Sequence, residues 1–482
     1  MGQIGRVGEG AAADLRLRST AGRGVLLAAV LGSGMAFLDA TVVNVALPHI
    51  GRDLNASLDG LQWTVSAYTL TLAAFVLLGG ALGDRFGRRR VFLLGVLWFA
   101  VASAACGLAQ SIGWLIVARA VQGTGAALLT PGSLALMEAS FHPDDRGRAI
   151  GAWSGLSGVS TAVGPFLGGW LIDAFSWRWI FYLNLPLAAA VIAASIRWVP
   201  ESRDPSRADT RFDVAGATLG AVGLAGVTYA LIEAAERGFG SWLVLSAIAV
   251  GVAGFAAFVL VERRRGARAM LPLGLFSSKL FSALNVYTVA VYAALSGMSF
   301  FLVVFLQNVV GLSALAAGAA LLPATILLLI GSAPAGRLAT RIGPRIPVTI
   351  GPLLAAVGLL MLRTIGPHAD YWLGVLPGTA VFGLGLTLLV APLTAAVLGA
   401  VGDRFAGVAS GVNNAAARAG GLLAVAALPL LVGMSGTSYE IPAELTAGFR
   451  AAMLWCAGLL VVGALLAAVA VPRRARLASA PA

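Results

Sequence analysis

Long apolar segments separated by short polar ones run along the whole chain. A helix needs about 20 predominantly apolar residues to cross a bilayer. We predict fourteen such spans, at 24–48, 61–83, 91–110, 113–140, 149–173, 179–199, 214–235, 242–261, 281–308, 314–336, 346–364, 371–399, 407–433 and 451–471. The pattern therefore predicts an all-α membrane protein.

Composition supports this class and excludes a soluble one. Of the 482 residues, 59% are hydrophobic and only 11% are charged, and the mean hydropathy is +0.89. The two cysteines, Cys106 and Cys456, both fall inside predicted spans, so no disulfide framework is expected.

The positive charge of the chain is an orientation signal. The formal net charge is +12. If both termini lie on one side, 26 of the 33 Lys and Arg residues fall in segments on that side and 5 on the other. Cytoplasmic loops carry such an excess. We therefore expect a multi-pass protein of the bacterial inner (plasma) membrane, with both termini cytoplasmic, that contacts membrane lipids and binds no nucleic acid.

A weak internal repeat divides the chain into halves. The segment Gly80–Arg89 matches Gly336–Arg345, and Asp145-Arg146 matches Asp403-Arg404 at nearly the same offset. Two six-span bundles with a two-span insert explain these matches, and such repeats build transporters. The predicted parts are a tail at 1–23, a bundle at 24–199, a linker with two spans at 200–280, a bundle at 281–471 and a tail at 472–482.

Asp39 is a carboxylate inside the first predicted span. An ionisable group at membrane depth costs at least ~2.5 kcal/mol, so such groups usually serve a pathway, a relay or a counter-ion. Burial raises a carboxyl pKa and a nearby cation lowers it. Asp39 is therefore the candidate proton carrier. A fixed structural ion pair or a polar contact between helices is the alternative.

Arg119 lies in the fourth predicted span at a similar depth. At a rise of about 1.5 Å per residue, Asp39 is about 14 Å and Arg119 about 9 Å from the outer ends of their spans. We predict that Arg119 acts on Asp39 directly or through Gln122 and water. The alternative is an arginine that extends to the outer surface.

Five motifs in order resemble the fourteen-span drug:proton antiporter branch of the major facilitator superfamily, over Gly24 to Val471. They are the Leu-Asp-x-Thr-x-Val-Asn-x-Ala-Leu-Pro pattern of Leu38–Pro48, the loop Gly80–Arg90, and the segments Arg119–Ala127, Gly164–Gly169 and Trp177–Pro186. The resemblance implies the major facilitator fold and proton-coupled export. It also implicates the arginine of the third motif in proton transfer.

Two of these motifs imply gating and direction of transport. By resemblance, the loop locks and unlocks the halves, which implies gating residues at Gly83, Asp84, Arg85, Gly87 and Arg88, and at Arg341 in the second copy. That copy has Thr340 in place of Asp84, so we expect an asymmetric gate. The string Gly164, Pro165, Gly168 and Gly169 resembles the motif that marks antiporters. We interpret the fifth motif as an interfacial aromatic anchor.

Candidate substrate contacts are polar or aromatic residues of spans expected to face a cavity. Lipid contact or core packing is the alternative for each. They are Asn44, Trp63, Tyr68, Trp153, Asn285, Tyr292, Phe301, Phe305, Gln307, Asn308, Asn413 and Asn414. In the C-terminal bundle we expect every carboxylate to lie in a loop, namely Asp370, Asp403, Glu440 and Glu444.

Other chemistries lack their sequence signals. The chain has no Gly-x-x-x-x-Gly-Lys-Ser/Thr loop, and its three histidines are scattered. We therefore expect no metal, no enzyme activity and no cofactor, with a proton gradient as the energy source.

The leading hypothesis is a monomeric, proton-coupled antiporter that exports lipophilic, often cationic, drugs or antibiotics by alternating access. Export of lipids or of an endogenous secondary metabolite on the same fold is the first alternative. A channel, which would not need a titratable Asp39, and an importer are the others.

Overall fold

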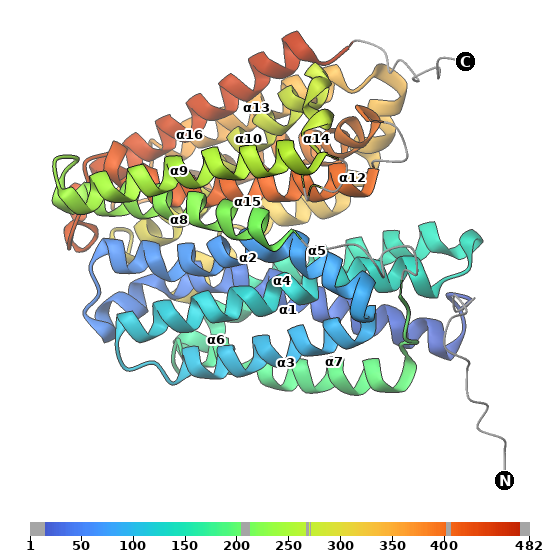
Figure 1. The fold of residues 1–482 in the computed structure, drawn as a ribbon. Helices are drawn as coiled ribbons and strands as arrows, with labels where there is room; N and C mark the ends of the chain where they lie inside the picture. Colours follow the sequence, from blue (N-terminus) through green and yellow to red (C-terminus); the bar gives the residue numbers. More distant parts are fainter. Residues whose placement is uncertain (1–14, 204–212, 267–268, 270, 402–405, 473–482) are drawn as a thin grey trace.

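The computed structural model describes residues 15–203, 213–266, 269, 271–401 and 406–472. In this part of the chain, fourteen helices are long and apolar enough to cross a membrane, which confirms the predicted number of spans. Figure 1 shows two groups of helices lying side by side, one from each half of the chain. The repeat member Asp403-Arg404 lies outside the described residues.

The first group holds the N-terminal half. Its helices are α1 (Thr20–Leu54), α2 (Leu58–Phe86), α3 (Arg88–Gly107), α4 (Ile112–Ser140), α5 (Pro143–Ala174), α6 (Trp179–Tyr182) and α7 (Asn184–Trp198). Serine side chains begin two of them, because Ser19 accepts a hydrogen bond from the Gly22 amide and Ser111 from the Trp114 amide.

Two inserted helices join the halves. They are α8 (Val214–Arg237) and α9 (Trp242–Arg265), which pack on each other, and α8 also packs on α2 and α15. The C-terminal half contains η3 (Leu273–Ser277), α10 (Lys279–Asn308), α11 (Ala314–Ala319), α12 (Leu322–Ile342), α13 (Arg345–Leu362), η4 (Tyr371–Val375), α14 (Leu376–Gly399), α15 (Ala406–Leu431), η6 (Ser438–Glu440) and α16 (Pro442–Ala470).

Several spans differ in detail from the prediction. The span predicted at 179–199 is divided into α6 and α7, and the one at 314–336 into α11 and α12. The last span begins earlier than expected, so that Glu444 lies in the first turn of α16 and not in a loop. Pro442, the first residue of α16, fits that start, because the first amides of a helix have no partner within it.

The internal repeat is visible in the backbone. Gly87 ends α2 with φ +113°, and Gly343, its match in the second copy, ends α12 with φ +88°. Residues with a side chain rarely adopt positive φ values. Both copies of the loop therefore require glycine at the same position.

The two halves are joined at one end, which we call the distal end, where α1 ends and α2 begins. The opposite end, where the described chain starts and finishes, is the terminal end. Every hydrogen bond between the halves within the described residues lies in the distal part: Leu58 to Gly436, Gln62 to Val425 and Ala426, Gln307 to Val45, Tyr439 to Ala56, and Ala314 and Leu315 to Asp173.

The terminal part of α5 has open space beside it. A methyl group placed on Gly147, Gly151, Gly155 or Gly158 would meet no other residue within 4 Å. Nearer the distal end the same helix packs on α11, where a methyl group on Gly169 would stand 2.5 Å from the Ala314 carbonyl oxygen. The structure is thus closed at the distal end and loosely packed along α5 at the terminal end.

Tyr439 contributes to the closed end through a group that does not ionise at physiological pH. Its hydroxyl donates to the Ala56 carbonyl at 2.7 Å. Burial, and then the neighbouring Glu440, raises the pKa of Tyr439 well above its usual range. The phenol therefore stays protonated and keeps this hydrogen bond in neutral and acidic solution alike.

Asp173 is the carboxylate that caps a helix of the other half. It ends α5, and its two oxygens accept from the amides of Ala314 and Leu315 at 3.1 and 2.9 Å. These amides are the first of α11 and have no partner within the helix. A carboxylate there also interacts favourably with the helix dipole.

We predict that Asp173→Ala loosens the distal end. Loss of a cap costs roughly 1 kcal/mol, which corresponds to about fivefold faster local opening. Hydrogen–deuterium exchange should accelerate in Ala314–Ala319. The control is Asp370→Ala, because Asp370 caps Trp372 and Leu373 within its own half. Unchanged exchange in α11 of the Asp173 variant would contradict this account of closure.

Candidate functional site

Asp39 lies in the middle of α1 and is completely buried. Its Oδ2 accepts from Nη1 of Arg119 on α4 at 2.5 Å, and its Oδ1 accepts from Nε2 of Gln122 at 2.8 Å. Arg119 is 1% exposed, so it does not extend to the surface. Both routes named in the prediction, a direct contact and one through Gln122, are present.

The Arg119 guanidinium is fixed on its other sides. Its Nε donates to the Thr64 carbonyl at 3.1 Å, and Nη1 also donates to Oε1 of Gln122 at 2.7 Å. Its central carbon lies 4.2 Å from the centre of the Tyr68 ring, close enough for a cation–π interaction. Because Tyr68 itself donates to the Ala36 carbonyl, the ring joins α2 to α1 and α4 at this site.

Asn184, at the start of α7, was missed by sequence reasoning. Its Nδ2 lies 3.4 Å from Oδ1 of Asp39 and donates to Oγ of Ser103 at 3.0 Å, and Ser103 in turn donates to the Phe181 carbonyl. Asn184 belongs to the segment Trp177–Pro186, which we interpreted as an anchor. Arg178 of this segment pairs with Asp53 at the distal end, whereas Asn184 faces the buried carboxylate.

The site is a buried ion pair surrounded by side chains that hydrogen-bond to it and to one another. Asp39, Arg119, Gln122, Asn184 and Ser103 are each 0–1% exposed. A buried ion pair is stable only when further hydrogen bonds satisfy both groups. Protonation of the carboxylate would cancel its charge and leave the arginine charge without its partner. The arrangement can therefore couple a proton to a rearrangement of α1 against α4.

The string Gly164–Gly169 brings α5 against α1 beside this pair. A methyl group on Gly164 would stand 2.3 Å from Oγ1 of Thr41, and one on Gly168 would stand 1.9 Å from Cγ2 of Val42. Gly169 packs on α11 of the other half, and Gly318 of α11 packs on the Pro165 carbonyl. This part of α5 therefore contacts the Asp39 helix on one side and the C-terminal half on the other.

The predicted gating loop forms a compact junction at the terminal end. Asp84 accepts two hydrogen bonds from Arg88 across the turn at Gly87. Glu201, which follows α7, accepts from the Arg89 amide, and its carboxylate lies 3.7 Å from Arg90. A methyl group on Gly87 would collide with Glu201.

The other predicted gating residues differ from one another in their contacts and exposure. Gly83 accepts the Gly87 amide through its carbonyl, Arg85 stacks on the ring of Phe86, and Arg341 is exposed in the last turn of α12. Glu201 is a charged member of the junction that sequence reasoning did not identify.

Three of the candidate substrate contacts line one pocket. Tyr292, Asn413 and Asn414 surround a pocket of about 80 Å³, together with Thr394, Val397, Leu398, Ser410 and Ala417. Asn413 donates to Oγ1 of Thr288 at 2.7 Å and approaches Oδ1 of Asn285 at 3.4 Å. The pocket therefore has a polar wall formed by α15 and α10.

Other candidates are engaged in packing between helices. Phe305 stacks on Phe449 with ring centres 4.2 Å apart, and Phe301 is 1% exposed. Trp63 packs against Tyr229 of the inserted helix α8 at 6.0 Å. Phe301 and Phe305 are therefore covered by neighbouring side chains in this conformation, whereas Trp63 is half-buried beside α8.

The remaining polar candidates bond to backbone or neighbouring side chains. Gln307 donates to the Val45 carbonyl and Asn308 to the Tyr439 carbonyl, both at the closed distal end. Asn44 donates within its own helix, and Trp153 donates to Oγ of Ser33.

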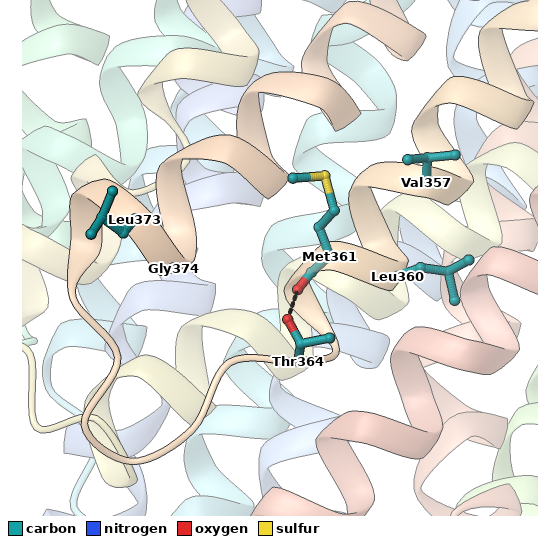
Figure 2. Close-up of a pocket in the computed structure, with 6 residues that line it drawn as sticks. All are labelled: Val357, Leu360, Met361, Thr364, Leu373 and Gly374. Atoms are coloured by element: carbon teal, nitrogen blue, oxygen red, sulfur yellow. Dashed lines mark hydrogen bonds between the residues drawn. The ribbon is translucent and has the colours of Figure 1, made fainter.

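The larger pocket is unrelated to Asp39. Figure 2 shows its lining of Val357, Leu360, Met361, Thr364, Leu373 and Gly374, from α13 and η4. Its volume is about 360 Å³, and Thr364 already donates to the Met361 carbonyl. These residues lie at the distal end of the C-terminal half and include no charged group.

We predict that the buried pair fails when one partner is removed. Arg119→Gln leaves a buried carboxylate uncompensated, a loss of about 3–5 kcal/mol. The double variant Asp39→Asn with Arg119→Gln should recover most of it. Thermal unfolding in detergent measures this, with Arg237→Gln, half-exposed in its own ion pair, as control. A double variant less stable than Arg119→Gln alone would contradict the pairing.

We also predict a specific cost of side chains at the α1–α5 contact. Gly168→Ala should lower the melting temperature, because overpacking costs about 1–3 kcal/mol. Val42→Ala in the same chain should restore it. Gly113→Ala is the control, since nothing lies within 4 Å of that position. Equal melting temperatures for Gly168→Ala and Gly113→Ala would show that the helices are not in contact as described.

The sequence matches the family model described as Major Facilitator Superfamily at residues 29–425 and 288–482. It is 37% identical to the tetracenomycin C resistance and export protein of Streptomyces glaucescens over 408 residues, 84% of this chain and 75% of the relative. It is 39% identical to multidrug resistance protein Stp of Mycobacterium tuberculosis over 404 residues (84% and 74%). It is 36% identical to puromycin resistance protein pur8 of Streptomyces alboniger over 463 residues (93% and 91%).

Solved structures of transporters share the fold. A bacterial homolog of the human lysosomal transporter Spinster, in an inward-facing and unoccupied conformation, superposes with a TM-score of 0.63 at 20% identity, covering 94% of this chain and 97% of that one. A peptide transporter POT in complex with sulfate gives a TM-score of 0.67 at 15% identity, with 95% and 96% covered.

Proposed function

The chain belongs to the Major Facilitator Superfamily, and on that premise we propose that it is a proton-coupled exporter of lipophilic drugs or antibiotics. It is a multi-pass protein of the bacterial plasma membrane and a transporter, not an enzyme. Relatives at 36–39% identity are named for drug resistance and export, which supports drugs as cargo.

The observation that carries the coupling is the buried pair of Asp39 and Arg119 with Gln122 and Asn184. An ionised carboxylate inside the membrane is expensive and usually functional. We propose that Asp39 carries the proton and that Arg119, with Gln122, sets its affinity for it. Protonation from outside weakens the contact between α1 and α4, and deprotonation toward the cytoplasm restores it.

The arrangement of the two ends supports alternating access. We infer from the charge bias of the loops that the terminal end faces the cytoplasm. The conformation described here is then closed to the outside, and its pocket of Tyr292, Asn413 and Asn414 belongs to the inward-facing state. We propose that the halves rock where the α5 glycines contact α1 and α11.

A second candidate is export of an endogenous metabolite or a lipid by the same mechanism. Other relatives include a probable actinorhodin transporter of Streptomyces coelicolor, at 36% identity. A self-made compound as the physiological cargo is compatible with the same coupling residues. We propose that a monomer suffices, because the two halves form one pathway, and that the proton gradient replaces any cofactor.

We predict that substrate addition moves protons in proteoliposomes only when Asp39 is intact. Ethidium, a phosphonium dye and a neutral lipophilic drug are added, with a pH-sensitive dye inside the vesicles. The wild type should release protons with at least one of them, and Asp39→Asn should release none.

Asp370→Asn is the matched control, because it removes a carboxylate that caps η4, outside both the buried pair and the gating loop, and should keep coupling. Drug movement without protons, or coupling that survives Asp39→Asn, would contradict Asp39 as carrier. Vesicles that move lipids or a metabolite but none of the drugs would favour the second candidate.

A further inference from the structure

Arg418 is a second arginine at membrane depth, and the mechanism above does not use it. It lies in the middle of α15, and its side chain is partly exposed. Its Nε is covered and has no hydrogen-bond partner, and no carboxylate within the described residues forms an ion pair with it. A charge kept there without a partner is costly unless it has a function.

The register of two helices places Arg418 on the face between the halves. A methyl group on Gly411 of α15 would stand 2.9 Å from Leu77 of α2, and Gln62 of α2 donates to the Val425 carbonyl of α15. Positions 411, 418 and 425 are seven residues apart and share one face of a helix. Since the two helices run in opposite directions, position 418 lies opposite the region of position 70.

In the described part of the chain, two tyrosine rings lie near Arg418. The ionisable groups that interact electrostatically with Arg418 are the phenols of Tyr68 and Tyr292. Tyr68 carries Arg119 on its ring, whereas Tyr292 lines the pocket with Asn413 and with Ala417, the residue before Arg418. Arg418 therefore lies between the proton site and the pocket of the C-terminal half.

We propose that Arg418 binds an acidic group of the cargo, a carboxylate or an ionised phenol attached to an aromatic body. This rests on the proposed function as an exporter and names its substrate class. Guanidinium pairs with carboxylate through two parallel hydrogen bonds. The ring of Tyr292 and the amides of Asn413 and Asn414 then contact the aromatic body and its polar substituents.

This inference replaces the expectation of often cationic cargo. In the described C-terminal half, Asp370, Glu440 and Glu444 lie at or beyond helix ends, and Asp403 is outside the described residues. The fixed charge at membrane depth in that half is positive. A lipophilic cation would be repelled by Arg418, whereas an acid would neutralise it.

The charge of the cargo determines how transport responds to the membrane potential. Exchange of one outgoing anion for one incoming proton moves two charges in the same electrical direction. Exchange of a cation for a proton moves none. A negative interior should therefore accelerate export of an acid strongly and leave export of an amine unchanged.

The test uses three probes with the same fluorescent body: 1-pyrenebutyrate, 1-pyrenebutanol and 1-pyrenemethylamine, at pH 8. Binding to the purified full-length protein is measured by pyrene polarisation, and transport in proteoliposomes with and without a valinomycin–potassium potential. We expect the wild type to bind the acid at least tenfold more tightly than the alcohol. Arg418→Gln should remove this preference while alcohol binding changes less than twofold.

Two further variants separate recognition from structure. Arg418→Lys should keep part of the preference, because it keeps the charge but not the paired geometry. Arg363→Gln, exposed at the distal end, should match the wild type. Potential-driven transport of the acid that disappears in Arg418→Gln would support the same conclusion.

The outcomes distinguish the two claims. A wild type that prefers the amine, or an Arg418→Gln variant that weakens all three probes equally, overturns the inference and leaves export untouched. A wild type that binds the acid through Arg418 but moves no probe under any gradient overturns the proposed function and leaves acid recognition in place. If Arg418→Gln does not fold, Arg418→Lys provides the test. Its preference for the acid over the alcohol must then be smaller than that of the wild type.

Discussion

A charge that cannot be left unpaired inside a membrane is the constraint on which this structure depends. Asp39 and Arg119 are both buried, and each is tolerated because the other is present. Gln122, Asn184, Thr64 and Tyr68 then take up the remaining hydrogen-bonding and ring contacts. Four helices, α1, α2, α4 and α7, are positioned by this one pair.

The same pair is connected to the rest of the molecule through glycines of α5, at which neighbouring helices approach closely. Gly168 brings α5 against α1 near Asp39, and Gly169 brings α5 against α11 of the other half. The distal end is held by hydrogen bonds to backbone groups. Such bonds depend on where the backbone lies more than on which residue occupies the accepting position. A change in the charge of Asp39 can thus reach the interface of the halves through α1 and α5.

The sequence was sufficient to predict features that depend only on position along a span. Hydropathy located the fourteen spans, and counting residues placed Asp39 and Arg119 at similar levels. The sequence was insufficient to predict which neighbour a side chain contacts, because this depends on how each helix is rotated about its axis. Asn184 faces Asp39 only because α7 turns that side toward α3. Phe305 is covered by Phe449 of α16. The start of α11 is capped by Asp173 from the other half, a contact that no local sequence pattern indicates.

The central claim is that the Asp39 carboxyl changes its protonation when cargo binds. Infrared difference spectroscopy of the purified protein, with and without a bound lipophilic drug, observes the C=O stretch of a protonated carboxyl directly. The account predicts that this band decreases on drug binding and is missing in Asp39→Asn. A band that is unaffected by the drug, or that persists in Asp39→Asn, would contradict it.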